Sequence, residues 1–86
     1  MTTATQFDAE SLKAILIENL GVDDDAIDGA WGSRPAELGI DSIGILELQA
    51  VVKEQYGVEL PETTNEQSLS GIVELVSTSL KERESA

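Results

Sequence analysis

Apolar residues recur at helical spacing in three separate segments of the chain, and this recurrence constrains the fold more than any other feature. Leucine, isoleucine and valine return every three or four positions within residues 9–20, 42–56 and 69–80. That spacing places them on one side of an α-helix. No segment alternates apolar and polar residues convincingly enough to predict a strand. The pattern predicts an all-α fold, a small bundle of three main helices plus one short helix, with a long ordered loop between the first two.

Turn-forming residues separate the first two helical segments. Asp8 is a good N-cap and Gly21 a natural stop, which sets the first helix at about residues 9–20. The stretch 21–41 is rich in aspartate and glycine and has no helical period, so it is predicted to be a loop. Packing of Trp31, Leu38 and Ile40 should hold this loop in place. Trp31 could equally begin a short helical turn.

The rest of the chain is predicted to be mostly helical. Asp41 should cap the second helix and Gly57 should end it. A short helix is expected over residues 62–67, and Ser68 should cap the last helix, whose apolar stripe is followed by a solvated, frayed tail. The chain is therefore predicted to be a single domain over residues 1–86, with a folded core at about 7–81 between polar termini.

The helix expected over residues 42–56 carries two apolar stripes instead of one. The first stripe consists of Ile45, Leu48, Val52 and Tyr56. The second lies on nearly the opposite side and consists of Ile43, Leu46 and Ala50. A surface helix in a small bundle needs only one apolar face. The second stripe is therefore either buried against the long loop or left exposed for a partner.

Charge and composition restrict the classes of partner. The 86 residues carry a formal net charge of −12 and contain neither histidine nor cysteine. Such a chain is repelled by nucleic acid and by anionic membranes and is attracted to basic protein surfaces. The amino-terminal residues lack the features of a signal peptide, and no apolar run is long enough to span a membrane. We expect a soluble cytoplasmic protein that is a monomer.

Catalytic and metal-binding readings fit the sequence poorly. A nucleophilic serine needs a general base, for which the chain has no histidine, and Ile40 stands where Gly-x-Ser-x-Gly requires its first glycine. A calcium loop starting at Asp24 fails, because Ala26 and Pro35 occupy positions three and twelve. The acidic residues are expected to form a solvated surface. We therefore expect a non-enzymatic protein without a metal site.

The Asp41-Ser42 step marks the candidate site. Taken alone, it is explained by Asp41 capping the helix with Ser42 as an ordinary first-turn residue. However, a hydroxyl at a helix N-terminus after a long loop is exposed and can carry a phosphodiester favoured by the helix dipole. The second apolar stripe also begins beside it, at Ile43. Gly44 either leaves room for a group lying along the helix or permits close packing.

With these residues in place, the chain resembles an acyl carrier protein. The resemblance covers essentially the whole chain, and its motifs are Leu38-Gly39-Ile40-Asp41-Ser42-Ile43, Leu46-Glu47-Leu48 and Tyr56-Gly57-Val58-Glu59-Leu60-Pro61. It implies that Ser42 carries 4′-phosphopantetheine, transferred from coenzyme A by a phosphopantetheinyl transferase. The thiol of that arm would hold acyl groups as thioesters.

The same resemblance implies roles for residues of the second helix. Apolar contacts to partner enzymes would come from Ile43, Leu46 and Ala50, and acidic contacts from Asp41, Glu47 and Glu54. The chain departs from the family pattern at Lys53, where an acidic residue is frequent, and at Ile43, where leucine is commoner. A contact role at Lys53 is therefore not carried over.

Within this family the chain looks most like the discrete carriers of bacterial type II (aromatic) polyketide synthases. The segment Ala26-Ile27-Asp28-Gly29, the run from Glu37 to Ser42 and the run from Tyr56 to Pro61 carry that likeness. It implies malonyl and growing polyketide cargo. The implied partners are a ketosynthase–chain-length-factor pair, a malonyl donor or acyltransferase, and a ketoreductase or cyclase. A fatty-acid carrier, a peptidyl carrier and an acidic helical interaction module without a prosthetic group remain the alternatives.

Overall fold

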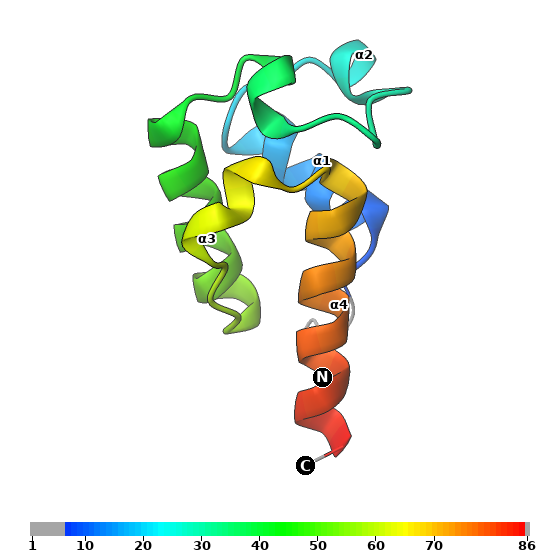
Figure 1. Ribbon diagram of the computed structural model, residues 1–86, viewed down its shortest axis with the longest axis vertical. Coiled ribbons are helices and arrows are strands. Elements are labelled where there is room, and N and C mark those ends of the chain that lie inside the picture. The colour runs from blue at the N-terminus through cyan, green and yellow to red at the C-terminus, as the bar shows by residue number, and fades with distance from the viewer. Residues whose placement is uncertain (1–6, 86) are drawn as a thin grey trace.

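Six helical segments and no strand make up residues 7–85, the part of the chain that the computed structural model describes (Figure 1). In chain order they are α1 (Ala9–Glu18), α2 (Asp24–Ile27), the 3₁₀ helix η1 (Pro35–Leu38), α3 (Ser42–Tyr56), the 3₁₀ helix η2 (Glu62–Glu66) and α4 (Leu69–Ser85). The prediction of an all-α fold with three main helices is confirmed. The predicted amino-terminal end of the domain, residues 1–6, lies outside the described residues.

Helix α1 begins at the predicted cap and ends two residues earlier than predicted. Asp8 Oδ1 accepts a hydrogen bond from Ser11 N–H at 3.0 Å, which lowers the pKa of the Asp8 carboxyl below its ordinary value. At the other end, Gly21 adopts a φ of +73° and Val22 N–H donates to Leu16 O at 3.0 Å. This reversal satisfies a terminal carbonyl and turns the chain out of the helix.

The segment between α1 and α3 contains more structure than the sequence predicted. It forms one turn of α-helix, α2, whose Ile27 is fully buried, and one turn of 3₁₀ helix, η1, which begins at the buried Pro35. Lys13 Nζ lies 2.8 Å from Asp24 Oδ1, and this contact raises the pKa of the lysine above its ordinary value. The ordered loop predicted over residues 21–41 did not include these two helical turns, because each is stabilised by a single buried residue and is too short to show a period.

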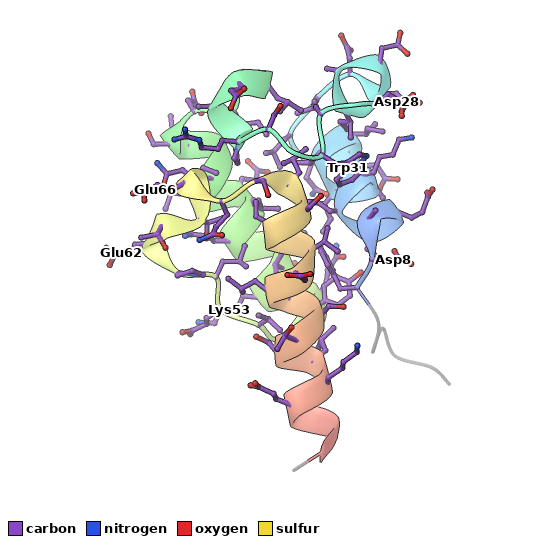
Figure 2. All side chains as sticks on the ribbon, turned by 45° about the vertical axis from the view of Figure 1, so that its right-hand side comes forward. Asp8, Asp28, Trp31, Lys53, Glu62 and Glu66 are labelled. Atoms are coloured by element: carbon purple, nitrogen blue, oxygen red, sulfur yellow. The ribbon has the colours of Figure 1, made fainter. Side chains whose placement is uncertain are left out.

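The three apolar residues expected to hold the segment do pack against the core. Ile40 is buried, and Trp31 and Leu38 are half-buried against the same cluster of side chains. Trp31 lies in a turn and does not begin a helix (Figure 2). The backbone of this segment also contacts α4 directly, since Ser33 O and Trp31 O accept hydrogen bonds from Leu69 N–H at 3.0 Å and Ser70 N–H at 2.9 Å.

Helix α3 has the predicted limits, and η2 and α4 follow it closely. Gly57 ends α3 with a φ of +71°, a backbone conformation that favours glycine. The short helix predicted over 62–67 is present as η2, a 3₁₀ helix. Ser68 caps α4 as predicted, with its Oγ accepting from Gly71 N–H at 3.0 Å.

Helix α4 is longer than the sequence predicted. It continues to Ser85 and projects beyond the other helices (Figure 1). Leu80 is buried, and the next two residues, Lys81 and Glu82, are exposed. The residues after Leu80 are mostly lysine, glutamate and arginine, which have high helix propensity, so the backbone can continue in the helix there.

The core is drawn from every part of the described chain. Phe7 and Tyr56 meet edge to face, with ring centroids 4.9 Å apart. The buried apolar residues are Phe7, Leu12, Ile15, Leu16, Ile27, Ile40, Ile45, Leu48, Val52, Val58, Leu60, Leu69, Ile72, Val76 and Leu80. Among the helices of residues 7–85, none combines the length and the apolar character required to cross a bilayer.

Candidate functional site

Ser42 is the first residue of α3, and the preceding residue fixes where the helix begins. Asp41 has an extended backbone, with φ −91° and ψ −171°. Its Oδ1 accepts a hydrogen bond from Gly44 N–H at 2.9 Å, and its carbonyl accepts one from Ile45 N–H at 2.9 Å. The predicted cap is confirmed, and it places the Ser42 side chain at the exposed start of the helix.

The Ser42 hydroxyl and the first two amides of α3 have no hydrogen-bond partners in the described part of the chain. Neither this hydroxyl nor the backbone N–H groups of Ser42 and Ile43 form a hydrogen bond within residues 7–85. Both residues are exposed. Two free N–H groups at the positive end of a 15-residue helix favour an anion at this position. The site therefore offers an exposed hydroxyl beside N–H groups that can stabilise a phosphate.

A groove of about 430 Å³ opens beside Ser42 between α3, η1 and η2. Its apolar lining consists of Ala36, Ile40, Ile45 and Leu46. The remaining residues that line it are Asp41, Ser42, Gln49, Glu62 and Asn65. The groove can therefore accept an apolar or amphipathic group attached near Ser42. Figure 2 labels Glu62 on η2, the segment that forms one wall.

Gly44 is explained by packing and does not leave room for a ligand. A Cβ atom at this position would lie 2.8 Å from Ile40 Cγ2 and 3.5 Å from Leu20 Cδ2. The side chain of Ile40 therefore occupies the space over the glycine. Of the two interpretations that the sequence left open, close packing is the one that the structure supports.

The second apolar stripe of α3 is exposed. Ile43 and Leu46 have 71% and 64% of their surface accessible, and Ala50 is exposed as well. By contrast, the other stripe supplies the buried Ile45, Leu48 and Val52, and the half-buried Tyr56. Exposed leucine and isoleucine side chains aligned on one helix face are typical of a surface that meets a partner.

Most of the sequence-predicted recognition residues share one shallow depression of about 430 Å³ on α3. It is lined by Ile43, Leu46, Glu47, Ala50, Val51 and Glu54. Asp41 lies outside this depression and instead shares a neighbouring hollow of about 490 Å³ with Ile43 and Glu47. The structure thus brings the six predicted residues onto two adjoining surfaces that share Ile43 and Glu47. Both surfaces combine apolar side chains with carboxylates.

Lys53 takes no part in this surface. Its Nζ lies 3.0 Å from Glu59 Oε2, in the turn that follows α3, and both side chains are largely exposed. It lines a different hollow, with Gly57, Val58 and Ser79. The lysine that departs from the acyl-carrier pattern therefore lies outside the depression. Its positive charge is paired with Glu59 and not with Glu47 or Glu54, which line the depression.

Comparison with known protein families shows which family the chain belongs to. A family model described as "Phosphopantetheine attachment site" matches residues 10–78, from the start of α1 to well inside α4. The chain belongs to this family. No solved structure matches the chain. Domains of the family are carriers that hold 4′-phosphopantetheine covalently on a serine, and they are generally non-catalytic. They work with a phosphopantetheinyl transferase and with synthase enzymes.

The residues of this carrier fit the prosthetic group. A phosphodiester at Ser42 would meet the free N–H groups of Ser42 and Ile43, and the arm beyond it would have the apolar groove alongside. Sequence reasoning missed the groove residues Ala36, Gln49 and Asn65. They come from three separate elements, η1, α3 and η2, so no local pattern connects them.

Proposed function

We propose that this carrier bears 4′-phosphopantetheine on Ser42 and tethers malonyl and growing polyketide intermediates in a bacterial type II polyketide synthase. The observation that carries the attachment site is the exposed Ser42 hydroxyl at the start of α3, beside two free N–H groups. When bound, the group supplies a flexible arm with a terminal thiol that holds acyl groups as thioesters. The polyketide assignment is supported by the motifs Glu37-Leu38-Gly39-Ile40-Asp41-Ser42 and Tyr56-Gly57-Val58-Glu59-Leu60-Pro61.

In the attachment step, Ser42 Oγ is the nucleophile. A bond forms between Ser42 Oγ and the pantetheine-side phosphorus of coenzyme A, the pyrophosphate linkage breaks, and 3′,5′-adenosine diphosphate leaves. The proton of the hydroxyl passes to a base of the transferase, since this chain has no histidine to accept it. The role of the carrier is to present the hydroxyl: Asp41 sets the start of the helix, and the N–H groups of Ser42 and Ile43 stabilise the phosphodiester.

Partner enzymes are proposed to meet the carrier at the depression on α3. Ile43, Leu46 and Ala50 would pack against an apolar patch of the partner. The carboxylates of Asp41, Glu47 and Glu54 would steer basic surfaces toward it, in keeping with the net charge of −12. The proposed partners are the transferase, a ketosynthase–chain-length-factor pair, a malonyl donor or acyltransferase, and a ketoreductase or cyclase.

Intact mass tests the attachment directly. The chain is incubated with coenzyme A and a phosphopantetheinyl transferase of broad specificity, and the modified peptide is mapped by fragmentation. We expect a gain of one phosphopantetheine on Ser42. No gain from a folded sample would refute the attachment at Ser42.

Reconstitution separates the polyketide carrier from a fatty-acid carrier. The modified chain is supplied with malonyl groups and with either a type II polyketide ketosynthase–chain-length-factor pair or a fatty-acid ketosynthase. We expect chain elongation with the polyketide pair and markedly less with the fatty-acid enzyme. The reverse preference would refute the polyketide assignment while leaving the attachment at Ser42 intact.

A further inference from the structure

Among the residues of α3 that line the groove beside Ser42, Gln49 is the farthest from Ser42 along the helix, and this position is called the far end of the groove. Ser42, Leu46 and Gln49 all line the groove from α3, and their spacing of four and then three residues places them along one face of the helix. Gln49 is therefore about 10 Å from Ser42 along the helix axis. Between these two positions, the groove runs along the first two turns of α3.

At this far end, a hydrogen bond joins the two walls. Gln49 Nε2 donates to Pro61 O at 3.1 Å, across from α3 to the residue that immediately precedes η2. The same carbonyl accepts from Thr64 N–H at 3.1 Å and from Thr64 Oγ1 at 2.5 Å. Pro61 O thus connects the start of η2 both to its own first turn and to α3.

The wall formed by η2 has little else buried within it. Thr64, with 1% of its surface accessible, is the buried residue of η2. Glu62, Thr63, Asn65 and Glu66 are exposed. Figure 2 shows the labelled Glu62 and Glu66 side chains directed away from the rest of the molecule. An element with so few buried contacts opens locally at low free-energy cost, so even an exposed hydrogen bond such as that of Gln49 shifts its opening measurably.

We infer that Gln49 closes the far end of this groove by joining α3 to Pro61, and that it thereby limits how much of an acyl group attached through Ser42 the groove can hold. For its cargo, this inference rests on the proposed function. The closure itself does not, because it involves only residues of the unmodified chain. Gln49 acts as a specificity-determining residue in this scheme, and it takes no part in attachment.

The closure is tested first on the unmodified chain. Gln49→Ala removes the donor, and Gln55→Ala is the matched control, since Gln55 is exposed on the same helix. NMR hydrogen exchange is measured at the Thr64 and Gln67 amides, whose hydrogen bonds to Pro61 O and Thr64 O lie within η2 and at its end. We expect exchange about twofold faster in Gln49→Ala, the effect of one lost exposed hydrogen bond. Equal exchange in the two variants would overturn the inference.

The limit on cargo is tested after loading with the octanoyl-phosphopantetheine moiety of octanoyl-coenzyme A. Chemical-shift changes caused by the octanoyl group should stop at Gln49 in the parent chain. In Gln49→Ala they should extend to Val52 and Leu60, the apolar residues next to the two ends of the lost hydrogen bond. The same boundary in both proteins would overturn the role of Gln49 in limiting the cargo.

The two proposals fail in distinguishable ways. Failure of the parent chain to load would refute attachment at Ser42, and the exchange comparison would still decide whether Gln49 joins the walls. Normal loading combined with unchanged exchange at Thr64 and Gln67 would refute the closure and leave the carrier function in place.

Discussion

The N-termini of α3 and α4 have similar sequences but different surroundings. Asp41-Ser42-Ile43-Gly44 and Ser68-Leu69-Ser70-Gly71 each consist of a capping residue, two further residues and a glycine. In both, the cap side chain accepts a hydrogen bond from the glycine N–H, at 2.9 Å in α3 and 3.0 Å in α4. The local structure of the two helix starts is therefore the same.

The difference lies in the two amides before each glycine. At α4 they are satisfied, because Leu69 N–H and Ser70 N–H donate to Ser33 O and Trp31 O. At α3 the corresponding amides of Ser42 and Ile43 have no partner within the described residues. The loop that contains Trp31 and Ser33 covers the start of α4, whereas no such segment covers the start of α3 within the described residues. A helix start can therefore hold an anion only where the tertiary structure leaves its amides free.

The largest expected effect is on attachment of the prosthetic group. Ser42→Ala should abolish the mass gain on incubation with transferase and coenzyme A, because the only proposed nucleophile is gone. Ser70→Ala, at the closed helix start, should leave the mass gain unchanged. Intact mass spectrometry measures both, with circular dichroism to show that each variant keeps its helicity. A modified Ser42→Ala variant, or an unmodified Ser70→Ala variant, would break the comparison.

The next largest effect concerns charge around the open helix start. Glu47→Lys should lower kcat/KM for modification by the transferase by about tenfold at low ionic strength and by much less at high ionic strength, because salt screens the steering of a basic partner. Glu74→Lys makes the same charge change on an exposed position of α4 and should have little effect. A loss for Glu47→Lys that is independent of salt would indicate a packing role for Glu47.

The two glycines should respond differently to the same substitution. Gly44→Ala would place a Cβ 2.8 Å from the γ2 methyl of the buried Ile40, and we expect the free energy of unfolding to fall by about 1–2 kcal/mol despite the better helix propensity of alanine. At Gly71 the nearest atoms are Gln67 Oε1 at 3.2 Å and Ser68 Oγ at 3.3 Å.

Because the Gln67 side chain is flexible, Gly71→Ala should change stability by less than about 0.5 kcal/mol. Urea denaturation of both variants checks the contrast. Equal losses at the two positions would show that the close contact of Gly44 with Ile40 does not distinguish the open helix start from the closed one.

The caps should contribute no more than the loss expected for Gly44→Ala. Ser68→Ala leaves a partly buried Gly71 N–H without its partner and should cost about 1 kcal/mol of unfolding free energy. Asp41→Ala should cost only about 0.5 kcal/mol, because water can replace an exposed acceptor for Gly44 N–H. Asp41→Asn should cost still less, since its amide oxygen also accepts. Thermal unfolding measures all three, and a larger loss for Asp41→Ala than for Ser68→Ala would contradict the difference in burial.

Much of the helical structure could be predicted from sequence because it depends on local chemistry. The limits of α3 follow from Asp41 and Gly57, and the caps of α1 and α4 from Asp8 and Ser68. The exposed stripe of α3 was visible as a second apolar face. The end of α1, the turns α2 and η1, and the extension of α4 were not predicted, because each depends on a few contacts or on propensity without a period.

The amino-acid sequence alone identifies the candidate residues: an Asp-Ser step at a helix start, a doubled apolar face and nearby carboxylates. The folded chain is needed to see which helix start is open, that Gln49 reaches Pro61 beside the groove, and that Ile40 fills the space over Gly44. The difference lies in the range of the interactions. Caps and periodicity act over a few residues, whereas the carbonyls of Trp31 and Ser33 reach α4, and Gln49 reaches Pro61, through the packing of distant segments.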